Sequence, residues 1–222
     1  MRRQKMIKLE KLEEPDLLKE NKDQWLREYL EAHQQNQWTD TIRYRYREEA
    51  IKTRIKEETY KKCVYCESKI MQCSHGDVEH ILPKSRFPEL VLTWSNLTLG
   101  CSICNTKKGA YYSEQIPLVN PYQNNPGDFL IATGSLVFQQ LGNQIGEITV
   151  RKLDLNRPDL LERRVERLKS LLNLITRYIE ANTQELKDSL LDQLKEEVRS
   201  DKEYTFVSKK FLKIDCAIPL ED

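Results

Sequence analysis

The sequence contains two Cys-x-x-Cys pairs, Cys63/Cys66 and Cys101/Cys104, with 34 residues between them. Each pair can present two thiolates from a tight turn, and four thiolates complete a tetrahedral Zn²⁺ site. A closed four-cysteine site has no open position for a substrate, so we expect this zinc to be structural. Its binding energy would contribute to folding, because the segment has few large apolar residues. Any catalytic metal is therefore expected elsewhere.

The remaining cysteines and the start of the chain indicate where the protein works. The chain opens with Met-Arg-Arg and a charged amphipathic segment, which is unlike a secretory signal, and it has no run of 18 apolar residues. We therefore expect a soluble cytoplasmic protein without membrane association, in which reduced cysteines bind metal. Cys73, which lies near His75 between the pairs, remains an alternative zinc ligand. Cys216 is expected to be an ordinary thiol, and His75 a surface residue.

Three short motifs follow one another between and after the cysteine pairs. They are Glu79-His80-Ile81-x-Pro83, Trp94-Ser95-Asn96-Leu97 and Cys104-Asn105-Thr106-Lys107-Lys108-Gly109. In this order they resemble the HNH endonuclease family, and within it most closely the retron- and Septu-associated PtuB-type nucleases. The resemblance implies a zinc-stabilised ββα-metal core. Because the last motif position is Asn105, the chain would be an H-N-N variant.

The residue types in these motifs suit the hydrolysis of a phosphodiester. His80 is the candidate general base, because an imidazole with a pKa near neutrality can take a proton from water. The carboxylate of Glu79 and the amide oxygen of Asn105 suit catalytic Mg²⁺ or Mn²⁺, which prefer oxygen ligands. Adjacent strand residues point to opposite faces, so Glu79 and His80 can act together only if the chain turns or twists there, and Pro83 is consistent with such a break. Asp77 is the rival carboxylate for the metal.

The resemblance also implies roles for residues beyond the base and the metal ligands. Asn96 would hold the loop after the first strand through backbone hydrogen bonds and so orient His80. Four basic residues are candidates for contact with nucleic-acid phosphates: Lys107, Lys108, Lys84 and Arg86. The sequence departs from the commoner family pattern at Glu79, where Asp is usual, and at Asn105, where His is usual. Both departures bear on the metal ligands more than on the fold.

Charge is balanced over the whole chain and slightly positive around the motifs. The chain has 222 residues, 32% of them charged, and a formal net charge of +1. Between residues 61 and 112 there are seven basic and four acidic residues. Attraction to nucleic acid must therefore be local, and tight binding is expected to need another surface or another protein.

The predicted fold class is α+β, with the zinc-stabilised ββα-metal core flanked by helices and by a small β-sheet. We expect an N-terminal helical segment at 1–60, the nuclease core at 61–115, and a region at 116–222 that packs as one unit with the core. One helix should open at Pro15-Asp16 with Trp25 as its anchor, and a second should run from Thr39-Asp40 to about Tyr60. Arginines on the second helix alternate with glutamates, which favours a solvated face over a phosphate-binding stripe.

The C-terminal half has strand-like and helical patterns. Runs 129–138 and 146–155 are rich in β-branched or aromatic residues and predict two strands. Apolar residues recur at helical spacing from 158 to 199, which predicts a helical hairpin or one bent helix. Their seam is predicted at Leu161, Val165, Leu168, Leu172, Ile175 and Ile179. The tail from 204 to 218 has extended or strand-like character.

The functional hypothesis is a metal-dependent endonuclease that cuts DNA and leaves 5′-phosphate and 3′-hydroxyl ends. The alternatives are an endonuclease for a structured RNA such as tRNA, and a zinc module that binds nucleic acid without cutting it. The resemblance implies a partner ATPase of the PtuA type in an anti-phage defence system. We expect the apolar seams at 16–30 and 158–198, and not the zinc core, to dock onto that ATPase.

Overall fold

The computed structural model describes residues 8–70 and 76–220. Contacts divide the chain into two compact units, one at 9–115 and the other from Ile116 onward. The predicted α+β class is confirmed, with small two-stranded sheets, helices and a buried cluster of four cysteines. The predicted packing of 116–222 with the core as one unit stays a prediction. Cys73 and His75 lie outside the described residues.

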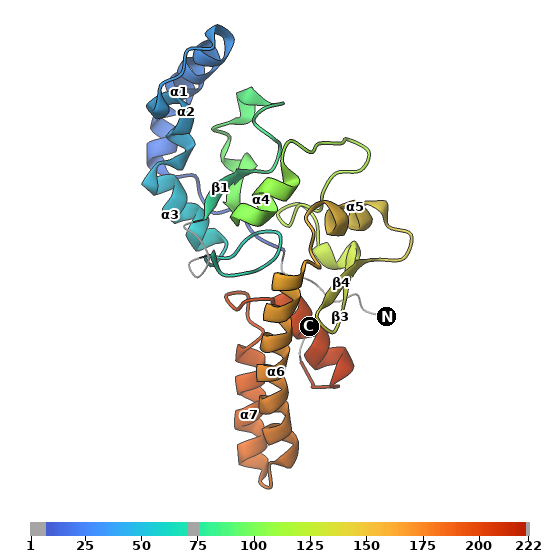
Figure 1. Cartoon of the computed structure of the whole chain (residues 1–222). Coiled ribbons are helices and arrows are strands. Elements are labelled where there is room, and N and C mark those ends of the chain that lie inside the picture. Colours follow the sequence, from blue (N-terminus) through green and yellow to red (C-terminus); the bar gives the residue numbers. More distant parts are fainter. Residues whose placement is uncertain (1–7, 71–75, 221–222) are drawn as a thin grey trace. The chain divides into compact units, whose positions relative to one another are not determined.

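The centre of the first unit is a ββα arrangement (Figure 1). Strand β1 (Asp77–His80) pairs antiparallel with β2 (Leu97–Gly100), so that Glu79 lies opposite Thr98 and His80 opposite Leu97. Helix α4 (Ser102–Lys108) follows β2 directly, and the Cys101 side chain accepts a hydrogen bond from the Cys104 amide at its start. Short 3₁₀ turns, η3 (Pro88–Leu90) and η4 (Trp94–Asn96), interrupt the connection between the strands.

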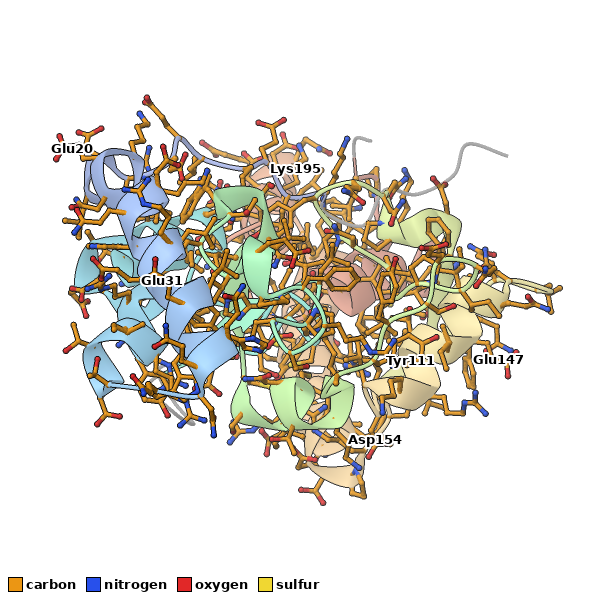
Figure 2. All side chains as sticks on the ribbon, turned by 90° about the horizontal axis from the view of Figure 1, so that it is seen from above. Glu20, Glu31, Tyr111, Glu147, Asp154 and Lys195 are labelled. Atoms are coloured by element: carbon orange, nitrogen blue, oxygen red, sulfur yellow. The ribbon has the colours of Figure 1, made fainter. Side chains whose placement is uncertain are left out.

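Helix α1 (Asp16–Gln35) begins directly after Pro15, as the sequence predicts. Leu18, Tyr29 and Ala32 are buried, whereas charged residues such as Glu20 are exposed (Figure 2). Trp25 is only half-buried, with the Arg45 guanidinium 5.4 Å from its ring centroid, so it is less central than predicted. His33 is exposed, and its ring lies edge-on to Trp38 with the centroids 6.1 Å apart.

The predicted second helix is broken, which corrects the expectation of a continuous helix to residue 60. Thr39 does cap α2 (Asp40–Tyr44), but a 3₁₀ turn, η1 (Arg45–Arg47), follows at once. Glu48 then has an extended backbone with ψ of 143°, and α3 (Glu49–Glu58) starts after it. The break turns Tyr46 inward, where only 3% of it is exposed. Tertiary packing of this ring outweighs the helical propensity of the segment.

The extended stretch before α1 is fastened to the core of its unit by polar bonds. Lys11 donates to Oε1 of the buried Glu58 at 3.0 Å, and the Leu12 amide donates to Oε2 at 2.9 Å. The Trp94 indole donates to the Leu12 carbonyl at 2.7 Å, and the Lys11 ammonium lies 4.1 Å from the Trp94 ring centroid. Residues 11 and 12 are therefore ordered, in an extended conformation.

The second unit contains one hairpin and a helix where a second strand was predicted. After a 3₁₀ turn, η5 (Pro126–Asp128), β3 (Leu130–Thr133) and β4 (Leu136–Gln139) both form within the first predicted strand. The predicted strand at 146–155 is wrong, because α5 (Gln144–Lys152) covers most of it. Asn143 caps that helix by accepting from the Gly146 amide at 2.8 Å. A Cβ on Gly146 would collide with the Phe129 carbonyl, so glycine permits close packing of α5 on the hairpin.

The long C-terminal helices form a hairpin, which is one of the two arrangements predicted for residues 158–199; the other was a single bent helix. Helix α6 (Pro158–Glu180) lies beside α7 (Gln184–Glu196) (Figure 1). The buried positions of α6 are Leu160, Arg164, Leu168, Leu171 and Ile175. The predicted seam is therefore shifted in part, because Val165, Leu172 and Ile179 are exposed. Arg164 enters the buried face because its guanidinium donates to the Leu155 and Ser135 carbonyls at 2.8 and 3.2 Å.

The tail is helical, which corrects the prediction of extended structure at 204–218. Helix α8 (Thr205–Lys210) continues into a π-helical turn, η6 (Phe211–Asp215). Val207 and Leu212 are buried, and the Thr205 hydroxyl donates to the Lys202 carbonyl at 2.7 Å. Among the described residues, no helix combines the length and apolar character needed to span a bilayer.

Candidate functional site

The four predicted zinc ligands meet in one buried cluster. The sulfurs of Cys63, Cys66, Cys101 and Cys104 all lie within 4.8 Å of one another. Cys66 and Cys101 are 3.9 Å apart at Sγ, close to the roughly 3.8 Å separation that follows from tetrahedral Zn–S bonds of about 2.3 Å. The donor set therefore fits Zn²⁺.

Local backbone structure brings each pair of sulfurs together. The Cys63 amide donates to the Ser68 carbonyl at 2.9 Å, and the Glu67 amide donates to the Cys63 carbonyl at 3.0 Å, with Glu67 at a positive φ of 61°. These bonds close the first turn, and the start of α4 supplies the second. Four thiolates packed this closely in a buried place repel one another, so the fully ionised cluster needs a cation.

His80 is held in one orientation at the end of β1. Its Nε2 lies 3.0 Å from the Val91 carbonyl oxygen, and its ring meets Tyr46 edge-on with centroids 4.7 Å apart. A carbonyl oxygen can only accept, so Nε2 must carry the proton in this bond. In the neutral imidazole Nδ1 then has the free lone pair, which is the form that a general base requires.

The surroundings of His80 favour this neutral form. The ring is buried, and burial lowers its pKa because the charged form loses solvation. The Val91 carbonyl opposes this change, whereas the positive charges of Lys84, Lys108 and Arg47 add to it. The resulting pKa of His80 is lowered to about 3. The imidazole is therefore neutral at pH 7, and its pKa lies well below the near-neutral value that was expected from the sequence.

Asn96 fastens the loop that carries the hydrogen-bond partner of His80. Its Oδ1 accepts from the Leu82 amide at 2.7 Å, and its Nδ2 donates to the Leu82 and Leu90 carbonyls at 3.1 and 3.2 Å. Its own carbonyl accepts from the Ile81 amide at 2.9 Å. Leu90 precedes Val91, so Asn96 fixes both ends of the loop around the imidazole.

Glu79 points to the opposite face of β1, as strand alternation requires, and is buried there. The Lys108 ammonium lies 2.6 Å from Glu79 Oε1, and it also donates to the His80 carbonyl at 2.6 Å. The Tyr65 hydroxyl donates to the same carboxylate at 3.5 Å. Burial raises the pKa of Glu79, and Lys108 and Tyr65 oppose that rise.

Asp77 and Asn105 lie together on the same face. The Asn105 Nδ2 donates to Asp77 Oδ2 at 3.3 Å, and both residues are half-buried. Gly100 separates them from Glu79: a Cβ at Gly100 would lie 3.1 Å from the Glu79 Cβ and 3.9 Å from the Asn105 Cβ. Glycine at this position therefore leaves room for the side chains of Glu79 and Asn105. Carboxylate and amide oxygens are the ligand types that Mg²⁺ and Mn²⁺ prefer.

The four basic residues expected to contact phosphate occupy different environments. Lys107 and Arg86 are exposed, and Lys84 is half-buried with its ammonium 2.6 Å from the Tyr46 hydroxyl. Lys108 is buried in the pair with Glu79, with only 3% of the residue exposed. Lys108 therefore supports the carboxylate of Glu79. The sequence predicted a phosphate contact for Lys108 and gave no indication of this buried role.

Two tyrosines at the site were also missed. Tyr46 packs on His80, and Tyr65 bonds to Glu79. Tyr65 lies inside the first cysteine pair, so its closeness to the motif was a usable signal. Tyr46 had no such signal, because it contacts His80 only as a result of the break between α2 and α3, which the sequence did not predict.

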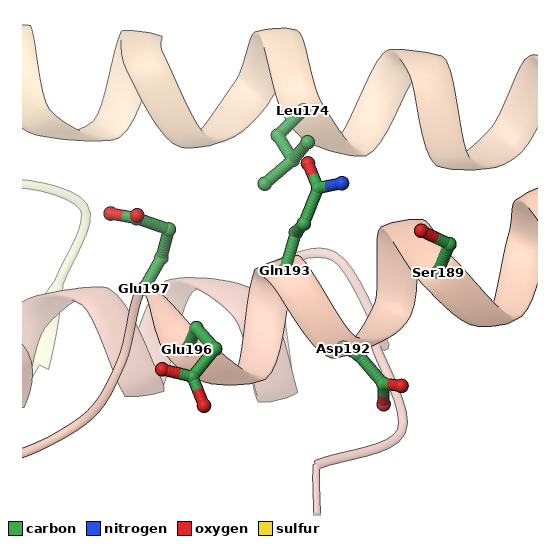
Figure 3. A pocket seen from close by; sticks show the side chains of 6 residues that line it. All are labelled: Leu174, Ser189, Asp192, Gln193, Glu196 and Glu197. Carbon is green, nitrogen blue, oxygen red and sulfur yellow. The ribbon is translucent and has the colours of Figure 1, made fainter.

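A shallow depression on the second unit is a poor candidate for phosphate binding. It lies on the α6 and α7 hairpin, with the lining shown in Figure 3: Leu174, Ser189, Asp192, Gln193, Glu196 and Glu197. Three of these six side chains are acidic, and an acidic lining repels a polyanion. Arg167 is 2.7 Å from Glu197 and neutralises only part of this charge.

Comparison with known proteins finds a family match over the part of the chain that contains the cysteines and the three motifs. Residues 63–110 match the family described as HNH endonuclease. A Septu protein PtuB of Bacillus thuringiensis is 41% identical over 81 residues, which are 36% of this chain and 32% of that protein. The Septu protein PtuB of Bacillus mycoides (strain KBAB4) is 27% identical over 202 residues, 75% of this chain and 68% of that protein. The first match thus spans about a third of its relative, and the chain is homologous to both.

Proposed function

We propose that this chain, which carries an HNH endonuclease domain homologous to Septu protein PtuB, is a metal-dependent endonuclease that hydrolyses phosphodiester bonds of DNA. The observation that carries the proposal is the fixed, neutral imidazole of His80. Its Nε2 is committed to the Val91 carbonyl, which leaves Nδ1 to take a proton from the attacking water. His80 is thus the proposed catalytic base, and Asn96 is the residue that positions it.

The acidic face of β1 is the proposed metal site, and it lies on the opposite side of the strand from His80. We propose that both faces reach one phosphate because β1 ends at His80 and the chain bends directly after it, at Ile81 and Leu82. We assign the catalytic Mg²⁺ or Mn²⁺ to the oxygen atoms of Glu79 and Asn105, with Asp77 as the further carboxylate beside Asn105. When bound, a divalent cation neutralises charge on the phosphate oxygens and stabilises the leaving oxygen. Lys108 holds the Glu79 carboxylate in place and favours its ionised form, against the burial that raises the pKa of Glu79.

The zinc and catalytic metals have separate sites in this proposal. The four cysteines would hold a structural Zn²⁺ with no position open to substrate, and their turn at 101–104 starts the helix that carries Asn105. Zinc would therefore act on catalysis only through the fold of the core.

Control of the nuclease is proposed from the homology and from one exposed surface. The relatives are Septu proteins, and we propose that this chain likewise acts in anti-phage defence with a PtuA-type ATPase. Leu172, Ile179 and Leu186 on the α6 and α7 hairpin have 49%, 67% and 44% of their surface exposed. Apolar side chains exposed to this degree are available to a partner, and we assign the ATPase contact to this hairpin.

A cleavage assay on both nucleic acids tests the proposal. Purified protein, alone and with the co-expressed ATPase, is incubated with labelled duplex DNA, single-stranded DNA and total tRNA in Mg²⁺ or Mn²⁺. We expect cut DNA with 5′-phosphate and 3′-hydroxyl ends. If the protein cleaves tRNA but neither form of DNA, the substrate is RNA. If it binds these nucleic acids and cleaves none of them, the protein is a non-catalytic zinc module.

A further inference from the structure

The break between α2 and α3 creates a cluster of cations and aromatic rings next to His80. Here residues 43–47 read Arg-Tyr-Arg-Tyr-Arg. The Arg47 guanidinium lies 4.7 Å from the Tyr44 ring centroid and 5.6 Å from that of Tyr46. The Lys84 ammonium lies 4.3 Å from the Tyr46 ring centroid. Two cations therefore face one buried ring, whose edge contacts the proposed catalytic base.

The neighbouring arginines of this segment differ in their charge partners. Arg45 forms an ion pair with Glu28 of α1. Within the described part of the chain, Arg47 has contacts with the rings of Tyr44 and Tyr46 but forms no ion pair, and it is exposed. Arg45 is thus used to pack the helices together, whereas Arg47 keeps its charge uncompensated at the surface.

Arg47 and Lys84 bring two positive charges to one tyrosine ring, and an anion bound beside them would be attracted by both. The Tyr46 hydroxyl accepts from Lys84 at 2.6 Å and so holds the ammonium in place, and the Tyr44 ring supports the planar guanidinium of Arg47. Both cations are therefore preorganised, and a guanidinium can bind a phosphate with two parallel hydrogen bonds.

We propose that Arg47 and Lys84 form a binding site for backbone phosphate of the substrate strand, next to the phosphodiester bond that the water activated by His80 attacks. The inference rests on the proposed nuclease function and extends it to the N-terminal helices, which lie outside the matched residues 63–110. The contact is to the phosphodiester backbone. It adds affinity and alignment without reading sequence.

Binding measurements on surface variants test this site. Fluorescence anisotropy of a labelled phosphorothioate duplex, which resists cleavage, is measured with the full chain over a series of salt concentrations. We expect Arg47→Ala and Lys84→Met each to weaken binding about fivefold to tenfold. Each should also reduce the slope of log affinity against log salt by about 0.9, the value for one lost duplex phosphate contact. The matched control is Arg27→Ala, an exposed arginine on α1 of the same unit.

The outcomes separate this inference from the proposed function. Equal affinity and equal salt slope for Arg47→Ala, Lys84→Met and Arg27→Ala, in a chain that cleaves DNA, would overturn the phosphate site alone. A wild-type chain that neither binds nor cleaves nucleic acid would overturn both. Thermal unfolding of each variant shows whether a loss comes from misfolding. Arg47→Lys, which keeps the charge but loses the paired hydrogen bonds, should recover only part of the affinity.

Discussion

The ammonium of Lys108 lies 2.6 Å from the carboxylate of Glu79, and both side chains are 4% exposed. The pair joins the end of α4 to the acidic face of β1. Lys108 also bonds to the carbonyl of His80, so one residue supports both chemical groups of the motif. Loss of either charge would leave the other buried without its partner, which is far more costly than the loss of a surface pair.

The first prediction separates the two carboxylates. Glu79→Gln should lower the free energy of unfolding by roughly 3–5 kcal/mol, because it leaves the buried Lys108 uncompensated. Asp77→Asn should leave stability nearly unchanged and weaken Mn²⁺ binding and cleavage. Denaturant unfolding and Mn²⁺ titration measure the two effects. The double variant Glu79→Gln/Lys108→Met should regain stability but not activity; full activity in it would remove Glu79 from the metal site.

Much of the core could be predicted from the sequence because its determinants are local. The spacing of the cysteine pairs predicts the cluster, and strand alternation predicts that Glu79 and His80 face opposite sides. Asn105 comes one residue after Cys104, so it must lie on the helix that the second pair begins. The buried role of Lys108 depends on the packing of α4 against β1 and has no local signal.

Two of the errors in the predicted elements have different physical causes. Tyr46 turns inward because His80 and Lys84, more than thirty residues away, complete its environment, and local periodicity contains no trace of that contact. The run at 146–155 resembled a strand because Ile148, Thr149 and Val150 are β-branched. The missed signal was Asn143, a helix cap placed directly before it.

The second prediction concerns the loop around the imidazole. Asn96→Ala removes three hydrogen bonds to the backbone of Leu82 and Leu90 and should lower the free energy of unfolding by roughly 2–3 kcal/mol. Cleavage should fall as well, since the Val91 carbonyl is no longer fixed. Ser95→Ala, at an exposed neighbour, is the control for both measurements. Unchanged kcat in a destabilised Asn96→Ala protein would limit Asn96 to a structural role.

The third prediction concerns zinc. Cys63→Ser should give insoluble or unfolded protein, because zinc binding contributes to folding of the core. Wild-type protein should contain one equivalent of zinc by elemental analysis, and Cys216→Ser, outside the cluster, should retain it. Soluble wild-type protein without zinc would contradict the structural metal.

The fourth prediction concerns the proposed partner. Leu172→Glu and Ile179→Glu change exposed positions of α6, so each should alter stability by less than about 0.5 kcal/mol. Co-expression with the ATPase and size-exclusion chromatography should show weaker association for both, and Ser170→Glu on the same helix is the control. If all three variants elute with the ATPase as the wild type does, the hairpin is not the contact surface.

Cleavage by His80→Ala in Mg²⁺ is the most direct test of the central claim, that a fixed neutral imidazole acts as the base of a nuclease. The account predicts that the variant keeps its zinc and its folded state by thermal unfolding. It also predicts a loss of at least about 100-fold in cleavage rate, the lower range for a general base. A folded, zinc-containing His80→Ala protein that cuts DNA as fast as the wild type would contradict the account.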